Sequence, residues 1–444
     1  MNNYLLSLNI KTYIIIGFTL MIILPFCISD GLNLLSLVNL FTVLFYGIIL
    51  FYTSQKEDSY YTNRNLFFTV FSISIFFLII LYSLSWFYNQ DIMVFCYSDA
   101  SYYLSTVEKM HQEDFFHSLR HIARWPSEDW GAPVSMLLFY NMIPSKAFIN
   151  FFYIILGSIS SVSLFQIGRR IMSLKHAYIS SLIFSISSYW IFYHSGCLKE
   201  SVMVFIVIES FYFFYKYLDD KKLYNIIIAI ITSLLLIFFR PAIIVFLWGG
   251  CSIYLMLNSN NKLIWITSLF LVSFTLYFSA SYIKDIFDHY THEGDVETIS
   301  TYIGATQFNI WTNRVASLIG PFPNLVANTD DISYKHIYGP GLLLKYMLFV
   351  PFWYAIYYSI KHKFWYILPI AFFAIFEMFS LYYINNGLVV RKALPHMPFF
   401  TIVALWMISL CDDNETFINH RFLTVSKISW IIVLISTFIW NVFK

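Results

Sequence analysis

Long apolar segments recur along almost the whole chain, and this feature limits the fold more than any other. Stretches of about 17–25 apolar residues match the length that a helix needs to cross a bilayer. The chain of 444 residues is 59% hydrophobic and only 12% charged, whereas soluble proteins carry about 25% charged residues. The sequence therefore predicts an all-α, polytopic membrane protein that forms one integral membrane domain over residues 1–444.

About thirteen membrane-spanning helices are expected from these segments. Arg240-Pro241 separates two of them, because proline breaks the helical hydrogen-bond ladder and the combined run is too long for one crossing. A single kinked helix is the alternative at this position. The expected spans lie near residues 12–29, 35–53, 66–87, 147–168, 177–194, 201–218, 224–239, 241–257, 263–283, 342–360, 364–384, 394–411 and 428–443.

Basic residues in short loops predict the orientation of the chain, because cytoplasmic loops carry an excess of Lys and Arg. Arg169, Arg170 and Lys175 form the most basic of these loops. With that loop inside, the N-terminus is expected to be cytoplasmic. Two long polar loops, 89–146 and 284–341, are then expected outside. They contain more than half of the acidic residues, and short interfacial helices are expected within them.

The sharpest candidate for chemistry in the first long loop is Asp99, within the acidic and aromatic string YSDASYY of residues 97–103. A carboxylate beside the bilayer can act as a general base toward an acceptor hydroxyl. It can also hold a divalent metal that carries a pyrophosphate. A solvated loop Asp or a helix N-cap gives the same pattern, so these alternatives stay open from the residues alone.

A second string in the same loop, RWPSEDWGAP at residues 124–133, places Trp130 between an acidic pair and a glycine. Tryptophan at this depth often serves only as an interfacial anchor. Glu128 and Asp129 are a second acidic pair whose spacing does not identify a metal or an acid–base role. Both strings indicate that the first loop folds against the membrane boundary.

Basic residues at the expected outer boundary are the candidates for binding a phosphate. A guanidinium suits phosphate because it offers a bidentate fork of donors. The candidates are Lys199, Arg240, Arg314, Arg391 and Lys392. Glu200 either pairs with Lys199 or complements the helix dipole, and snorkelling to head groups is the alternative for Arg240.

Two carboxylates within expected spans, Glu209 and Glu377, favour a different class of protein, because intramembrane carboxylates often mark ion or proton paths. The sequence assigns no residue as a metal ligand. The spacing of His289, His292 and Glu293 is only loosely metal-like. A cofactor is therefore not identified, and a divalent ion such as Mg or Mn stays open.

The order of these short motifs resembles the GT-C superfamily of polytopic membrane glycosyltransferases from bacterial surface-polysaccharide synthesis. The motifs are SDAxYYL, WGxP, GxLKE, FRP and a late outer Arg before a Pro-rich span entry. The general layout is also similar to Wzy-type O-antigen polymerases. One departure is that the acidic loop follows the third expected span, whereas in many GT-C enzymes it follows the first.

The resemblance implies a lipid-linked sugar donor on undecaprenyl phosphate or diphosphate and a glycan or lipid-linked acceptor. It implies a multi-pass protein of the bacterial inner membrane, surrounded by membrane lipids and without a nucleic-acid partner. Asp99 is then expected as the catalytic base. The resemblance assigns the carrier phosphate to Lys199, Arg240 and Arg391, and the sugar or lipid pocket to Tyr103 and Trp130.

Two other classes compete with a glycosyltransferase. A transporter or flippase of lipid-linked sugars would explain the intramembrane carboxylates, although no internal repeat of the kind common in transporters is visible. An acyl- or phosphotransferase acting on lipids would require a His-Asp or Arg-rich signature, which the chain does not show. The chain also offers no Gly-rich phosphate loop for a nucleotide, which agrees with a donor activated by lipid phosphate.

Overall fold

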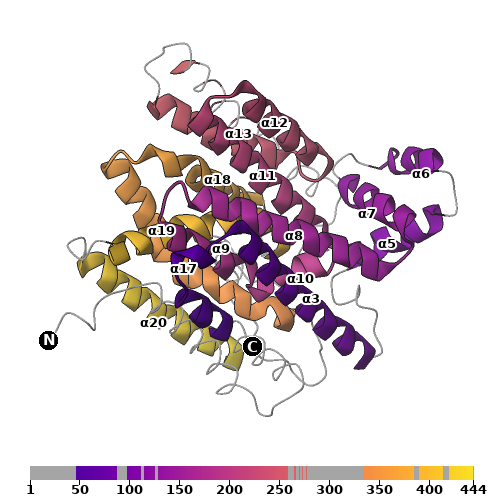
Figure 1. The fold of residues 1–444 in the computed structure, drawn as a ribbon, viewed down its shortest axis with the longest axis horizontal. Coiled ribbons are helices and arrows are strands. Elements are labelled where there is room, and N and C mark those ends of the chain that lie inside the picture. The colour runs from indigo at the N-terminus through magenta and orange to yellow at the C-terminus, as the bar shows by residue number, and fades with distance from the viewer. Residues whose placement is uncertain are drawn as a thin grey trace.

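The computed structural model describes residues 47–87, 98–111, 115–125, 129–258, 335–384, 390–413 and 420–443, together with isolated helical positions between 265 and 277. Every regular element in these ranges is a helix (Figure 1), which confirms the all-α class. The expected span 12–29 lies outside the described residues, as do residues 35–46 of the span 35–53 and most of the span 263–283.

The helices are named in chain order, with 3₁₀ helices marked η. They are η1 (Asp58–Tyr60), α3 (Asn63–Phe87), α5 (Ser98–Met110), α6 (Phe115–Ile122), α7 (Gly131–Met142), α8 (Lys146–Gly168), α9 (Leu174–Ser185), α10 (Ser188–Ser195), α11 (Lys199–Asp220), α12 (Leu223–Leu234), η3 (Leu235–Phe238), α13 (Ala242–Asn258), α17 (Lys335–Lys361), η4 (Trp365–Ile367), α18 (Leu368–Ile384), η5 (Val390–His396), α19 (Met397–Asp413) and α20 (His420–Phe443).

Four described segments are long and apolar enough to cross a membrane: α3, α8, α11 and Ala393–Cys411, which includes most of α19. Four further apolar helical stretches are shorter, at Leu223–Phe238, Ala242–Asn258, Trp365–Leu381 and Thr424–Thr437, the last of them within α20. Apolar helices of spanning length are the mark of an integral membrane protein. The expected number of about thirteen spans is not confirmed by these helices.

The expected span 177–194 is not one helix in the structure. It is divided into α9 and α10, which are too short to cross a bilayer separately. Ile186 is the C-cap of α9. Ser187 is the N-cap of α10, and its hydroxyl accepts a hydrogen bond from the backbone N–H of Trp190 at 3.3 Å. The backbone N–H of Gly341 donates to the Ser188 hydroxyl at 2.9 Å, so α17 fixes the start of α10.

Other helix boundaries also differ from the expected ones. The helix expected at 342–360 begins at Lys335, within the second long loop, and the segment expected at 394–411 begins as the 3₁₀ helix η5. The break predicted at Pro241 is present, because α12 ends in η3 and α13 begins only at Ala242. Proline has no backbone N–H, which explains why the break was predictable.

The interior of the bundle is formed by α8 to α11 and by α17 to α19, and α10 is completely buried. Close packing is clearest between α13 and α18, where a Cβ atom at Gly250 would lie 2.4 Å from the Pro369 carbonyl oxygen. The surfaces of α3, α12 and α20 instead expose large apolar side chains, including Phe68, Ile231 and Ile432. Such surfaces suit contact with lipid rather than water.

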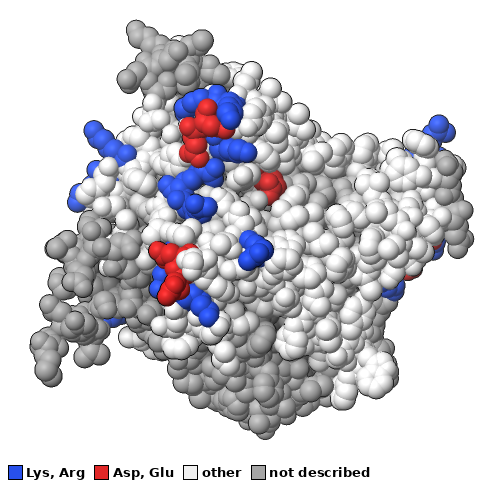
Figure 2. All heavy atoms as spheres, in the orientation of Figure 1, with Lys and Arg blue, Asp and Glu red and all other residues white. Residues whose placement is uncertain are grey.

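One end of the bundle collects basic loops. Arg170, which follows α8, forms an ion pair of 2.5 Å with Asp219 at the end of α11. The Tyr366 hydroxyl of η4 donates to the same carboxylate. These contacts join the loop after α8 to the end of α11 and to η4, and we name this part of the molecule the basic end. On the face of the molecule shown in Figure 2, most of the visible charged side chains lie in the left half, beside a broad uncharged area.

The short helices α5, α6 and α7 lie at the opposite end of the bundle (Figure 1). Helix α7 leads into the start of α8, and Arg170 follows the end of α8. With 23 residues, α8 is about 35 Å long, so it separates the two ends by roughly the thickness of a bilayer core. We name the second end, formed by α5 to α7 and the start of α11, the loop end.

Candidate functional site

At the loop end, an ion pair joins the first long loop to the start of α11. The Lys199 ammonium lies 2.7 Å from Oδ1 of Asp129, and the Tyr103 hydroxyl donates to the same oxygen at 3.1 Å. The ammonium also lies 6.0 Å from the centre of the Tyr103 ring. Lys199 is therefore held by Asp129, a residue of the loop, and not by its neighbour Glu200.

Aromatic packing holds this part of the loop in place. Tyr102 stacks on Trp125, with ring centres 5.8 Å apart, and the Trp130 indole N–H donates to the Trp125 carbonyl at 2.8 Å. Tyr103 is buried and Trp130 is half-buried. The two residues predicted to shape a pocket thus lie in the interface between the loop and the bundle.

Asp99, the predicted catalytic base, is the second residue of α5, one helical turn before Tyr103. Its side chain lies outside the described residues, so its role as a base stays a prediction. Tyr102 and Tyr103 follow Asp99 by three and four positions in α5, which are the neighbouring positions on the surface of a helix. The backbone therefore places Asp99 close in the chain to the Tyr103–Asp129–Lys199 contact.

Glu200 is buried in the first turn of α11, within electrostatic range of Tyr153 of α8. The turn before it is anchored by Asn150 of α8, whose amide donates to the Ser195 carbonyl at 2.9 Å and accepts from the Cys197 thiol at 3.0 Å. Cys197 has a φ of 57°, a conformation that is uncommon for residues other than glycine. Packing around Asn150 therefore holds a strained turn directly before Lys199.

Arg240 lies where the loop end meets the bundle interior. Phe238 stacks on Trp130 with ring centres 5.7 Å apart and an angle of 12° between the rings. Phe239 packs so closely on Gly131 that a Cβ atom there would lie 2.4 Å from the ring. The next residue, Arg240, is within electrostatic range of the Glu377 carboxylate. Arg240 thus follows the two residues that contact the loop and interacts with a carboxylate of α18.

Glu377 belongs to a group of buried ionisable side chains that we name the interior cluster: Lys345 of α17, Glu377 of α18 and His396 of η5. Each is at most 2% exposed. Nδ1 of His396 lies 3.4 Å from Oε2 of Glu377, and Lys345 interacts electrostatically with both groups. Their side-chain nitrogen and oxygen atoms make no hydrogen bond to the residues that the structure describes.

Ionisable groups buried among apolar helices are expensive and usually functional. The sequence analysis identified Glu377 and Arg240 but not Lys345 or His396. The signal that marks the two missed residues is their position, because Lys345 lies within the expected span 342–360 and His396 within 394–411. Each is an ionisable residue in an otherwise apolar segment, and only the fold shows that they meet Glu377.

The second intramembrane carboxylate, Glu209, lies elsewhere in the bundle, where it accepts a hydrogen bond from the Ser163 hydroxyl of α8. Arg391 and Lys392 belong to η5, and their side chains lie outside the described residues. Arg314 lies wholly outside them. The structure therefore gives no side-chain contact for these three predicted phosphate ligands.

Within the described ranges, no three His, Cys, Asp or Glu side chains lie together as metal ligands would. His289, His292 and Glu293 are outside these ranges, as is the Asp99 side chain. Whether a divalent metal binds at the loop end therefore stays open, as it was from the sequence.

No protein-family model, curated protein or solved structure matches the chain. Short motifs in the sequence and the geometry of the loop end and the interior cluster are what support a function.

Proposed function

We propose that the chain is a membrane glycosyltransferase. It moves a sugar or glycan from an undecaprenyl-phosphate or -diphosphate carrier to a surface-polysaccharide acceptor, at the extracytoplasmic face of a bacterial inner membrane. The observation that carries this proposal is the position of Arg240. Arg240 directly follows Phe238 and Phe239, which contact Trp130 and Gly131 of the first long loop. A cation at this boundary suits a donor whose leaving group is a lipid phosphate.

In the proposed reaction, Asp99 removes the proton of the acceptor hydroxyl while that oxygen attacks the anomeric carbon of the donor sugar. The bond between the anomeric carbon and the phosphate oxygen breaks, and the electron pair leaves with the lipid phosphate. Arg240 stabilises the negative charge that develops there. One displacement of this kind inverts the anomeric centre and requires no covalent enzyme intermediate.

The remaining basic candidates differ in how they support this reaction. Lys199 is engaged by Asp129 at 2.7 Å, so it contacts a phosphate only when it leaves that carboxylate or shares it. Its first role in the structure is to join the loop to α11. Arg314, Arg391 and Lys392 are proposed as further phosphate contacts on the resemblance alone, and Glu200 as a substrate contact on the same basis.

A polymerase that joins repeat units, similar to the Wzy-type enzymes, uses the same donor chemistry and is the alternative within the same class. The polymerase differs from a single-sugar transferase in the size of the group that it transfers. The two are separated by the product that remains when the gene is deleted.

A transporter or flippase of lipid-linked sugars is the second class, and two observations favour it. The interior cluster places several ionisable groups at one point inside the bundle. Helices α9 and α10 also form a discontinuous segment, a feature that transporters often use at their binding sites. In reconstituted vesicles, a flippase would move the lipid-linked sugar from one leaflet of the membrane to the other and leave it chemically unchanged, whereas a transferase would consume it.

The proposal is tested by deleting the gene in its native strain and resolving the surface polysaccharide on a gel. Complementation with Asp99→Asn is expected to leave the protein inserted and abundant but the glycan absent. Arg240→Ala is expected to slow donor use by about 10²–10³-fold, because it removes donors to the developing charge. Arg64→Ala, an exposed arginine of α3 near the basic end, is the matched control and should complement fully.

The products identify the class of enzyme. A single repeat unit that remains after deletion indicates a polymerase, and long chains that lack one sugar indicate a side-branch transferase. Wild-type glycan from Asp99→Asn would refute the catalytic assignment. An unchanged glycan after deletion would contradict both enzyme proposals.

A further inference from the structure

Helix α6, at the loop end, packs on the protein with its less polar side. Ser118 and Ile122 are buried one helical turn apart, and the Ser118 hydroxyl donates to the Met110 carbonyl of α5 at 3.0 Å. Phe115 is half-buried and packs against the core. The apolar side of this amphipathic helix is therefore used for contact within the protein.

The opposite side of α6 is exposed and basic. Residues 115–125 contain two arginines, two histidines and no acidic residue. His117, Arg120 and His121 are exposed and lie within about 100° of arc, because each residue of a helix turns by about 100°. Arg124 is exposed in the next turn, where its backbone N–H donates to the His121 carbonyl at 3.2 Å. Figure 2 shows basic side-chain atoms projecting at its right edge, over α6.

An aromatic stack adjoins this basic side. Tyr102 of α5 is 58% exposed and stacks on Trp125 with ring centres 5.8 Å apart. The ring centre of His121 lies 6.4 Å from that of Trp125. We name this continuous area, formed by Tyr102, Trp125 and the exposed basic residues of 117–124, the α6 surface. Tyr102 follows Asp99 by three positions in α5, so the α6 surface begins beside the predicted catalytic residue.

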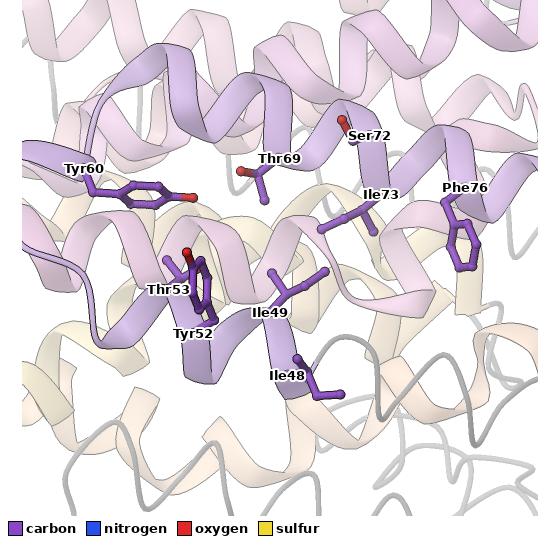
Figure 3. A pocket seen from close by; sticks show the side chains of 9 residues that line it. All are labelled: Ile48, Ile49, Tyr52, Thr53, Tyr60, Thr69, Ser72, Ile73 and Phe76. Carbon is purple, nitrogen blue, oxygen red and sulfur yellow. The ribbon is translucent and has the colours of Figure 1, made fainter.

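Lipid-facing surfaces of this protein have a different composition. A groove of about 390 Å³ between the helical residues 47–54 and α3 (Figure 3) has an almost wholly apolar lining, in which Ile48 and Phe76 are 65% and 46% exposed. Within α6, Phe116 is the only exposed large apolar side chain. A helix that lies on a bilayer turns its apolar face to the lipid, whereas α6 turns that face to the protein. The α6 surface therefore suits a hydrated, negatively charged partner.

We propose that the α6 surface binds an acidic glycan, whose sugar rings carry carboxylate groups. Arg120 and Arg124 contact the carboxylates, because a guanidinium offers a carboxylate two parallel donors. The exposed ring of Tyr102 offers a flat apolar face on which the C–H face of a sugar ring packs. The inference rests on the proposed function where it names acidic sugars as the acceptor, but binding itself requires no sugar transfer.

The experiment measures the affinity of tri-galacturonic acid for the purified full-length protein in detergent by isothermal titration calorimetry. Its methyl ester is the matched neutral probe, because it keeps the three rings and removes the charges. The wild type is expected to bind the acid at least about tenfold more tightly than the ester, the effect of one charge-assisted hydrogen bond.

Two sets of variants separate the charge from the ring. Arg120→Gln together with Arg124→Gln is expected to remove the preference for the acid. Tyr102→Ala is expected to weaken binding of both probes about fivefold, whereas Tyr102→Phe keeps the ring and should bind as the wild type does. Arg64→Gln, at an exposed position of α3, is the matched control and should change neither affinity.

Equal affinity of the wild type for the acid and the ester would overturn the proposal, as would the absence of binding or an unchanged preference in the double arginine variant. Anionic lipid is the partner instead if that variant retains less phosphatidylglycerol in native mass spectrometry but binds the acid unchanged, and this too overturns the proposal. Wild-type glycan from Asp99→Asn would refute the proposed chemistry without altering these affinities, so the two failures are distinguishable.

Discussion

The interior cluster makes a quantitative prediction about stability. Lys345 is 1% exposed and Glu377 is 2% exposed, so removing one of the two charges leaves the other in a low-dielectric interior with less compensation. The two side chains interact electrostatically without a hydrogen bond between them, and breaking a closely paired buried ion pair typically costs about 3–5 kcal/mol. We therefore expect Lys345→Met and Glu377→Leu each to lower the free energy of unfolding by up to about 3–5 kcal/mol.

The double variant gives a different expectation. Replacing both side chains by apolar groups of similar volume leaves no charge at positions 345 and 377, and such replacements are often neutral or stabilising. Arg240 then loses its interaction with Glu377, so Lys345→Met/Glu377→Leu is expected to be more stable than Glu377→Leu alone without reaching the stability of the wild type. The four proteins form a double-mutant cycle that isolates the interaction between the two side chains.

The assay is reversible unfolding in mixed micelles of a mild detergent and dodecyl sulfate, followed by circular dichroism. Lys361→Met is the matched control, because Lys361 lies on the same helix, α17, but is exposed at the basic end. It should change the free energy by no more than about 0.5 kcal/mol. If Lys345→Met destabilises the protein no more than this control does, the cluster is hydrated and the reasoning fails.

Two further predictions concern packing and the loop end. Gly250→Ala is expected to destabilise the bundle by about 1–3 kcal/mol, because the new Cβ would lie 2.4 Å from a backbone oxygen of Pro369. In the control Gly168→Ala, the new Cβ would lie 3.3 Å from its nearest neighbour, a side-chain atom, and the cost should be smaller. Equal unfolding free energies for the two variants would contradict this prediction. Asp129→Asn removes the charge that holds Lys199 and is expected to lower the unfolding free energy by at most about 1 kcal/mol, since the pair is partly exposed. The glycan output of Asp129→Asn in the complementation assay is nevertheless expected to fall clearly below that of the wild type. A full output would show that the ion pair does not serve the proposed reaction.

Features that depend on neighbouring residues in the chain were predictable from the sequence. The length of the apolar segments indicated an all-helical membrane protein, because the bilayer sets the length of a spanning helix. The break before Ala242 followed from Pro241, which cannot donate to the helical ladder. The loop containing Arg170 was recognised as basic from the sequence, and in the structure Arg170 pairs with Asp219 at the basic end.

Features that depend on partners far apart in the chain were decided by the tertiary structure. Lys199 pairs with Asp129, seventy positions away, although Glu200 adjoins it in the sequence. The expected span 177–194 divides where Ser188 meets Gly341 of α17. The interior cluster gathers residues from α17, α18 and η5, which no local pattern connects. Composition and periodicity describe what one helix buries, whereas the packing of several helices selects which buried groups meet.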